Sequence, residues 1–412
     1  MSFLIEKARQ LLSEGELCDH CLGRMFSQLG TALKNNERGR ALRIAVCMED
    51  HRALRPPENC WVCRNAFTQV ERWAQRAVER VLPLEFKTYL MGTRVPAKIE
   101  MIEKHLREKY KLGGEPFKQS FNREVGRRFG EIVAERKHPI IVDFLDSEIA
   151  LLMDSETEML ELRINPLFIY GRYRKLVRTI PQTRWPCRDC KGRGCERCHH
   201  TGKMYEESVE ELVSGPVLAV THGSGTAFHG AGREDIDALM LGTGRPFVLE
   251  VKEPRVRTLD IETLQNEVNA QAQGKIEISE MRRVKTDIVE RVKSLEAEKI
   301  YEALVCFDKP LSDEILNGAL EKLQGVTIEQ RTPQRVAHRR ADLVRKRRVI
   351  AIAGNLVSEC EARVRIHCEG GLYIKELVSS DEGRTTPSLS ELVKTPAQVI
   401  ELNVLEVLGD FA

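Results

Sequence analysis

The chain has 412 residues, of which 42% are hydrophobic and 31% charged, so it is long and apolar enough for two or three domains with hydrophobic cores. Its 64 basic and 62 acidic residues leave a formal charge of +2, so overall charge does not indicate a nucleic-acid partner. The apolar runs fall far short of the roughly 20 residues that a membrane helix needs, and the first residues lack the apolar core of a signal peptide. We expect a soluble cytoplasmic protein without a membrane partner, monomeric by default.

The spacing of apolar residues predicts four segments along the chain. Residues 1–65 are expected to form a helical module around cysteines, and 66–175 an α+β domain. Residues 176–204 form a short connector rich in cysteine, glycine and basic residues, and 205–412 alternate between strands and helices. Helices are predicted at 3–12, 38–49, 95–111, 121–137 and 279–299, the last being the longest. Strands are predicted at 139–144, 160–169, 217–220, 247–251, 300–306, 349–353 and 361–367.

Eight of the twelve cysteines fall in four CxxC pairs, which is the spacing of metal ligands rather than of a disulfide framework. The first two pairs are Cys18 with Cys21 and Cys60 with Cys63. Two such turns direct four thiolates toward one tetrahedral cation and leave no open position for water, so they favour a structural zinc site. The alternative is that these are unpaired cysteines at helix ends.

The second group is denser and comprises Cys187, Cys190, Cys195 and Cys198. Glycines in the short spacer allow the backbone to turn sharply between the two knuckles. A second zinc is the favoured interpretation, although so short a spacer leaves a strained or half-occupied site open. Redox chemistry is less favoured, because neither pair lies at a strand-to-helix turn of a βαβ unit.

Basic residues gather in two stretches. Residues 171–193 hold eight Arg or Lys against one acid, with Tyr173 and Trp185 between them, and residues 331–348 again hold eight against one. Such local density suits phosphate neutralisation, and flat aromatic rings can stack on bases. A solvated charged face is the alternative for one stretch alone, but two stretches, one of them joined to a cysteine knuckle, favour nucleic-acid binding.

The glycine-rich segment 221–251 contains a tight polar turn at 232–237 that leads into an apolar run. No GK[ST] follows at the spacing of a phosphate loop, and no strand–GxGxxG–helix unit of a dinucleotide site is present. An aspartate on such a turn could act as a nucleophile or base, three neighbouring acids could bind Mg²⁺, or the turn could be a solvated loop. Residue chemistry alone leaves these three readings open.

The string GREDIDALMLG, at 232–242, resembles the catalytic turn of the pseudouridine synthases. Three further strings extend the resemblance to the archaeal tRNA pseudouridine synthases that act on uridines 54 and 55 of the TΨC loop and carry a THUMP domain. They are CDHCLGRMF, GRYRKLVRTIPQTRWPCRDCKGRGCERCHHTGK and GGLYIKELVSSDEGRTTPSLSELV. The resemblance implies an α+β fold: a catalytic domain over 205–412 with a mixed, mainly antiparallel sheet and helices. It would be preceded by a zinc-containing α+β THUMP-type RNA-binding region: a helical zinc-binding module over 1–65 and a THUMP-containing α+β domain over 66–175, with a zinc-ribbon-like connector over 176–204. In the THUMP-containing domain, FNREVGRR at 121–128 is the most distinctive run.

The resemblance also implies site residues. Asp235 takes the place of the family's catalytic aspartate, Tyr301 that of the tyrosine that stacks on the target uracil, and Lys375 that of the basic residue paired with the aspartate. Arg233 and Tyr373 would join Tyr301 in binding substrate. Because the isomerisation balances its electrons within the substrate, the implied activity needs no organic cofactor or cosubstrate, and its partner is tRNA.

Alternatives remain for these assignments. Asp237 becomes the catalytic residue if the alignment shifts by two positions, Tyr301 could be a core aromatic, and Lys375 an ordinary exposed lysine. At the level of the whole protein, a non-catalytic zinc-containing tRNA-binding protein would explain the cysteines and basic stretches but not the 221–251 segment. A THUMP-bearing methyltransferase or thiolation enzyme would need a nucleoside-cofactor fold or a phosphate loop, and the sequence contains neither.

Overall fold

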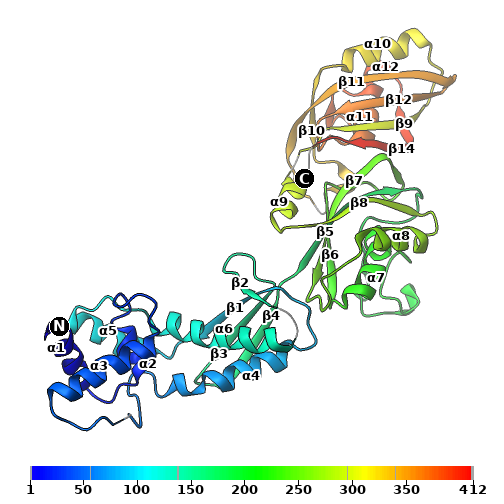
Figure 1. The fold of residues 1–412 in the computed structure, drawn as a ribbon. Helices are drawn as coiled ribbons and strands as arrows, with labels where there is room; N and C mark the ends of the chain where they lie inside the picture. The colour runs from blue at the N-terminus through cyan, green and yellow to red at the C-terminus, as the bar shows by residue number, and fades with distance from the viewer. Residues whose placement is uncertain (1, 56, 137–138, 295, 339, 410–412) are drawn as a thin grey trace. The chain divides into compact units, whose positions relative to one another are not determined.

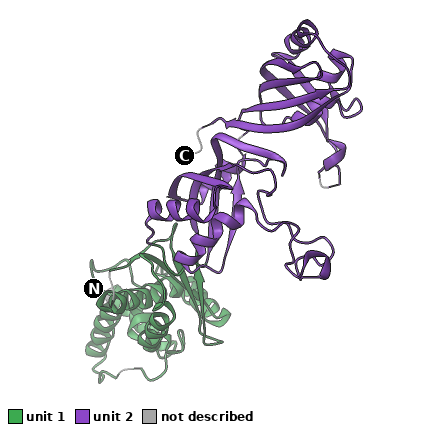
Figure 2. Ribbon diagram, turned by 90° about the vertical axis from the view of Figure 1, so that its right-hand side faces the viewer, with its two compact units in different colours: residues 1–166, 253–257 green, residues 167–252, 258–412 purple. Residues whose placement is uncertain are grey.

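The computed structural model describes residues 2–55, 57–136, 139–294, 296–338 and 340–409. The chain forms two compact units, residues 1–166 with 253–257 and residues 167–252 with 258–412 (Figure 2). Each unit has its own buried apolar core. Among the described helices, none combines the length and apolar character needed to cross a membrane.

The first unit begins with helices that surround the first cysteine group. They are α1 (Ser2–Ser13), α2 (Asp19–Arg24), α3 (Asn35–Glu49), the 3-10 turn Ala66–Gln69 and α4 (Val70–Val81). Helices α2 and α3 cross with their backbones in direct contact. A Cβ on Gly23 would lie 1.8 Å from the Asn35 carbonyl oxygen, so no side chain fits there. A Cβ on Gly39 would likewise lie 1.9 Å from the carbonyl oxygen of Asp19. Only glycine permits so close an approach.

A four-stranded sheet follows in the order β2-β1-β3-β4, with β1 parallel to β2 and β3 and with β3 antiparallel to β4. Its elements are β1 (Thr88–Arg94), α5 (Ala97–Tyr110), α6 (Phe117–Arg136), β2 (Ile141–Val142), β3 (Ile149–Asp154) and β4 (Met159–Ile164). Helix α6 contains the run 121–128 and contacts β1, where the Tyr89 hydroxyl donates to the Gly126 carbonyl at 2.8 Å. Figure 1 shows α4 and α6 together beside this sheet.

The second unit is built on a ten-stranded sheet in the order β13-β10-β11-β12-β9-β14-β7-β5-β8, with β6 paired to β7 (Figure 1). All neighbouring strands are antiparallel except β14 and β7, so the sheet is mixed and mainly antiparallel, as expected. The strands are β5 (Leu167–Lys175), β6 (Gly225–Gly230), β7 (Ala238–Lys252), β8 (Ile276–Val284), β9 (Lys299–Phe307), β10 (Thr327–Arg331), β11 (Val344–Ser358), β12 (Glu361–Cys368), β13 (Thr385–Thr386) and β14 (Ala397–Val407).

Helices cover this sheet in two groups, each with its own core. Helices α7 and α8 contact each other near β8, whereas α10 contacts β11 and α12, and α11 contacts β14. The helices are α7 (Val209–Thr221), α8 (Ile261–Gln271), α9 (Asp287–Ser294), α10 (Asp313–Leu323), α11 (Ile374–Ser379) and α12 (Leu389–Val393), with short 3-10 turns at Glu196–Cys198 and Gln334–Val336. The candidate site lies where the turn before β7 meets α11.

The predicted helices at 3–12, 38–49, 95–111 and 121–137 correspond to α1, α3, α5 and α6; Lys137 lies outside the described residues. The strands predicted at 247–251, 300–306, 349–353 and 361–367 are also present, within β7, β9, β11 and β12.

Other predicted elements were wrong or misplaced. Residues 217–220 form the end of α7 rather than a strand, because the Ser208 side chain caps this helix and it continues through the apolar run. The long helix predicted at 279–299 is wrong as well. Its first part, residues 279–284, lies in β8 and pairs with β5, and among the described residues of this range only Asp287–Ser294 are helical.

Two strand predictions in the first half of the chain also had the wrong limits. The strand predicted at 139–144 is confined to Ile141–Val142, because the Asp143 side chain accepts from two backbone N–H groups just beyond it and forms a turn. The strand predicted at 160–169 is two strands, β4 and β5. Strand β5 pairs with β7 and β8 and so belongs to the second unit.

Gly39→Ala is expected to destabilise the first unit by about 1–3 kcal/mol, because the added methyl group meets backbone that cannot move aside. Gly215→Ala is the matched control, since nothing lies within 4 Å of a Cβ at this position in α7. The control should be neutral or stabilise the protein by about 0.5–1 kcal/mol. Urea-induced unfolding of both variants measures the difference, and equal effects would contradict the close crossing.

Candidate active site and cysteine groups

A cavity of about 370 Å³ opens beside the turn that precedes β7, entirely within the second unit. Its walls come from this turn, from β9, from the segment after β10 and from the start of α11. The cavity brings together all five residues that the resemblance implied for catalysis and substrate binding: Arg233, Asp235, Tyr301, Tyr373 and Lys375. They come from three segments that are far apart in sequence, and the fold brings these segments together.

Asp235 lies between two cations. The Arg335 Nη1 atom lies 3.0 Å from its Oδ1 atom, and the Lys375 Nζ atom lies 3.5 Å from its Oδ2 atom. The Asp235 side chain is 29% exposed, so it is reached from the cavity while its charge is compensated from two sides. The pairing of Lys375 with Asp235 was predicted from the sequence, but that of Arg335 was not. The only sequence signal for Arg335 is its place in the basic stretch 331–348.

Lys375 is shared between two carboxylates. Its Nζ atom lies 2.7 and 3.0 Å from the two carboxylate oxygens of Asp237, closer than it lies to Asp235. Burial opposes ionisation of Asp237, but the hydrogen bonds and charge of Lys375 outweigh it, and the pKa of Asp237 falls below its ordinary value. Asp237 is the more exposed of the two aspartates, with 65% of its side chain accessible.

A buried ion pair fixes the turn that carries these aspartates. Glu234 and Arg245 form an ion pair, with the Arg245 Nε atom 2.9 Å from a Glu234 carboxylate oxygen and side chains only 1% and 2% exposed. The Tyr173 hydroxyl lies 2.7 and 2.9 Å from the two oxygens of Glu234, and burial raises the pKa of Tyr173, so the phenol stays protonated and donates. Gln182 donates to this hydroxyl at 2.8 Å and to the Gly232 carbonyl at 2.9 Å.

Two cations of the first basic stretch bind the backbone of the same turn. Lys175 Nζ donates to the carbonyls of Asp235 at 3.2 Å and Ile236 at 2.8 Å, and burial lowers its pKa. Arg178 donates to the Asp237 carbonyl at 2.8 Å. These two residues therefore bind the protein's own backbone. The sequence had instead indicated that the basic residues of this stretch bind phosphates.

Aromatic side chains also line the cavity. Tyr301 lies on β9 between Ile366 of β12 and Val404 of β14, and burial raises its pKa. At the cavity wall, the Arg233 guanidinium lies 4.8 Å from the ring centroid of Trp185. Trp185 had been noted only as an aromatic within a basic stretch, and its place in this cavity could not be read from that pattern.

The backbone of Tyr373 is fixed on both sides by one side chain. Gln330 accepts from the Tyr373 N–H at 2.8 Å and donates to its carbonyl at 3.0 Å. The Gln330 side chain is itself buried at 1% exposure. The start of α11, and with it Lys375, is therefore held to strand β10.

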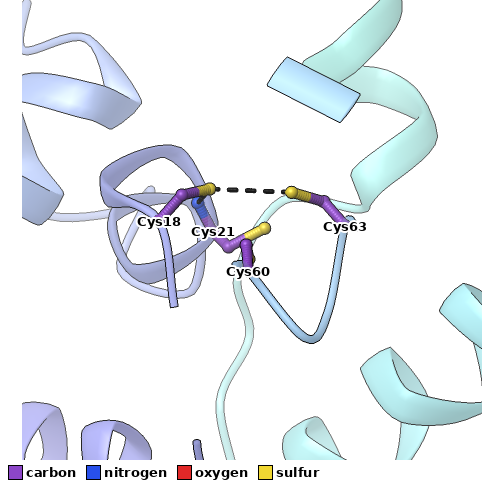
Figure 3. Close-up of side chains that lie close together, drawn as sticks. All are labelled: Cys18, Cys21, Cys60 and Cys63. Atoms are coloured by element: carbon purple, nitrogen blue, oxygen red, sulfur yellow. Dashed lines mark hydrogen bonds between the residues drawn. The ribbon is translucent and has the colours of Figure 1, made fainter. Parts of the chain in front are cut away.

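The sulfur atoms of Cys18, Cys21, Cys60 and Cys63 point toward one another from α2 and from the loop before α4 (Figure 3). All four lie within 4.8 Å of each other, and those of Cys18 and Cys63 are 3.7 Å apart. Four converging sulfurs at this spacing suit a tetrahedral metal ion. This group could hold a metal with no ligand position left for water.

The second group, Cys187, Cys190, Cys195 and Cys198, converges in the same way, with all sulfurs within 4.8 Å of each other. Backbone N–H groups of Gly194 and Gly202 donate to the sulfurs of Cys190 and Cys198 at 3.2 Å. Burial opposes ionisation of Cys198, but the backbone hydrogen bonds from Cys195 and Gly202 help to lower the pKa of its thiol. Gly192 and Gly194 both have φ of +93°, the conformation that glycine permits in so short a spacer. This group too could hold a metal ion.

Two family models and several relatives match this chain. Residues 168–408 match the family model "Pus10, C-terminal", and residues 73–154 match "Pus10 THUMP domain, archaeal". The chain is 46% identical to the tRNA pseudouridine synthase Pus10 of Halorubrum lacusprofundi, over 99% of this chain and 97% of the relative. It is 37% identical to that of Pyrococcus furiosus, over 99% and 98%.

Two solved structures share part of the fold at low similarity. A Cbf5-Nop10-Gar1 complex matches at 16% identity and a TM-score of 0.31, over 48% of this chain and 45% of the other. A pseudouridylate synthase matches at 14% identity and a TM-score of 0.20, over 57% and 63%. The assignment of the chain depends on the family models and relatives, not on these two structures.

The catalytic-domain and THUMP matches define a pseudouridine synthase, an isomerase, with an attached THUMP domain. The chain belongs to the Pus10 family of tRNA pseudouridine synthases. The resemblance drawn from the sequence is thus confirmed. Neither a non-catalytic binding protein nor a THUMP-bearing methyltransferase or thiolation enzyme is favoured.

Removing one member of the buried ion pair should destabilise the second unit strongly. Arg245→Leu strands the Glu234 carboxylate without its cation and is expected to cost about 3–5 kcal/mol, part of which Glu234→Gln should restore in the double variant. The matched control is Arg174→Gln, which removes an exposed ion pair with Glu277 and should cost about 0–1 kcal/mol. Urea-induced unfolding tests this, and similar losses in Arg245→Leu and the control would refute it.

Proposed function

We propose that this protein converts uridine to pseudouridine at positions 54 and 55 of the TΨC loop of tRNA, with Asp235 as the nucleophile. The observation that carries the proposal is the convergence of Asp235, Tyr301 and Lys375 on one cavity. The reaction breaks the bond from uracil N1 to ribose C1′, turns the base and joins C5 to C1′. The hydrogen on C5 leaves as a proton while N1 gains one, so atoms and electrons balance without an organic cofactor or cosubstrate.

The cavity suits a base that has left its stack. Unstacking costs a few kcal/mol, so a pocket must offer the extruded base a replacement surface. Tyr301 supplies an aromatic face within the cavity, and Leu372 and Val404 supply apolar walls. Arg233 and Tyr373 stand at the same cavity and would contact the flanking nucleotides or their phosphates.

The charges around Asp235 suit a nucleophile. Two cations, Arg335 and Lys375, lie beside the Asp235 carboxylate and compensate its negative charge. Tyr301 would stack on the uracil, and Lys375 would pair with Asp235 while leaving the carboxylate able to approach the base or ribose. Asp237 is the less suitable nucleophile, because its carboxylate is more exposed and takes the shorter contacts with Lys375.

We further propose that both cysteine groups hold structural zinc, since four sulfurs leave no coordination position for a reacting water. The first group would fix the helices around α2, and the second would fix the segment that carries Trp185. The THUMP domain would bind tRNA away from the TΨC loop. We retain the expectation of a monomeric cytoplasmic enzyme.

Tritium release from tRNA transcripts labelled at uracil C5 tests the reaction, because forming the new bond ejects that hydrogen. Wild type should release tritium, and Asp235→Asn should lower the single-turnover rate by at least about 10²-fold, the low end for a positioned reacting group. Asp237→Asn is the matched variant and should retain most activity. Loss in Asp237→Asn alone would move the nucleophile by two residues, and no release by wild type with tRNA still bound would refute the enzymatic proposal.

The same assay separates the two target positions. Transcripts in which uridine 54, uridine 55 or both are replaced by cytidine should lose release in proportion to the replaced targets. Full release from the doubly replaced transcript would contradict the assignment to the TΨC loop.

Metal analysis tests the zinc proposal independently of activity. Wild type purified without chelators should carry two zinc ions per chain, one for each four-cysteine group. Cys60→Ser and Cys198→Ser should each lose one, whereas Cys47→Ser, outside both groups, should lose none. Mass spectrometry of the bound metal gives the stoichiometry. One zinc in wild type, unaffected by Cys198→Ser, would show that the second group is not a zinc site.

A further inference from the structure

We infer that Arg335 is a positioning residue that fixes the orientation of the Asp235 carboxylate for the proposed isomerisation. This inference rests on the proposed function and adds a residue to it. Arg335 lies in the 3-10 turn Gln334–Val336, between β10 and β11, and its side chain reaches the cavity from that segment. It is therefore brought to Asp235 by a part of the chain about 100 residues away.

One guanidinium joins two structural elements. Its Nη1 donates to Asp235 Oδ1 at 3.0 Å, and its Nε donates to Glu376 Oε1 at 2.6 Å. Its Nη2 adds a longer contact of 3.4 Å to the second oxygen of Glu376. The Glu376 side chain is 5% exposed, so it holds the guanidinium by charge-assisted bonds in a buried place.

The planar guanidinium transmits this constraint to the nucleophile. Because its nitrogens are held in a rigid fork, two bonds to Glu376 also fix where Nη1 points, and Nη1 in turn fixes Asp235 Oδ1. Lys375 cannot do this alone. Its ammonium is a point charge on a flexible stem, lies 3.5 Å from Asp235, and makes its closer contacts with Asp237.

The backbone that carries Arg335 is itself anchored. The Gln334 N–H donates to Asp381 at 3.1 Å, and the Gln334 side chain donates to Glu382 at 2.8 Å. Arg384 donates to the Thr332 carbonyl at 2.7 Å, and Val336 is buried at 4% exposure. Arg335 therefore extends from a fixed segment rather than from a free loop end.

The test measures the single-turnover rate of tritium release at saturating tRNA, together with the tRNA dissociation constant, for a set of variants. Arg335→Gln should lower the rate about 10²-fold with the dissociation constant roughly unchanged, because a misplacement near 1 Å costs about that much. Arg335→Lys should recover part of the rate, since it restores the charge but not the fork. Arg363→Gln is the matched control, an arginine in an ion pair with Glu302, and should behave as wild type.

A second comparison guards against a purely structural effect. Arg335→Gln leaves the buried Glu376 carboxylate without its cation, which could disturb α11. Combining it with Glu376→Gln removes the unpaired buried charge, so the double variant should remain folded and still react slowly. Recovery of the wild-type rate in the double variant would overturn the positioning role.

Other outcomes overturn the inference in distinguishable ways. A wild-type rate in Arg335→Gln overturns it alone. A higher tRNA dissociation constant with an unchanged single-turnover rate at saturating tRNA would make Arg335 an RNA contact instead. An inactive wild type, or full activity in Asp235→Asn, would overturn the proposed function and this inference with it.

Discussion

The buried ion pair between Glu234 and Arg245 is the constraint on which the candidate site depends. Two charges removed from water are tolerated when they compensate each other and have further polar partners. Here Tyr173 donates to the Glu234 carboxylate, Gln182 donates to Tyr173, and Arg245 donates to the Ala231 carbonyl. The turn cannot move without exposing this pair or breaking it. Asp235, the next residue along the chain, therefore takes its place from a neighbour that is fixed in the core.

Local patterns predicted much of the fold and of the site. The cysteine spacings, the amphipathic helices such as α5, and the polar turn leading into an apolar strand all reflect contacts within a few residues. Predictions were wrong where tertiary pairing decided the outcome. An apolar run at 217–220 suits a strand or a helix equally, and residues 279–284 became part of a strand because β5 offered an edge to pair with. The contact between Arg335 and Asp235 was not predicted, because no local pattern around Arg335 indicates a partner so distant in sequence.

The basic stretches illustrate why composition alone cannot name a partner. A guanidinium or ammonium group bonds a backbone carbonyl as readily as a phosphate oxygen, so charge density does not separate the two uses. Lys175 and Arg178 bind carbonyls of the turn at 235–237, and Arg331 pairs with Asp342 inside its own stretch. Part of what the sequence offered as an RNA-binding surface is thus internal support for the site.

The carboxylate of Asp235, the proposed nucleophile, belongs to a chain of alternating charges that no single segment contains. Glu376 binds Arg335, Arg335 and Lys375 bind Asp235, and Lys375 also binds Asp237. These charged residues come from the turn before β7, the segment after β10 and the start of α11. The orientation of Asp235 therefore depends on the packing of all three segments. The Glu376 side chain is only 5% exposed, so its pair with Arg335 is the least screened by water among these interactions. A motif at 232–242 can therefore indicate a candidate nucleophile, but only the assembled domain fixes the orientation of its carboxylate.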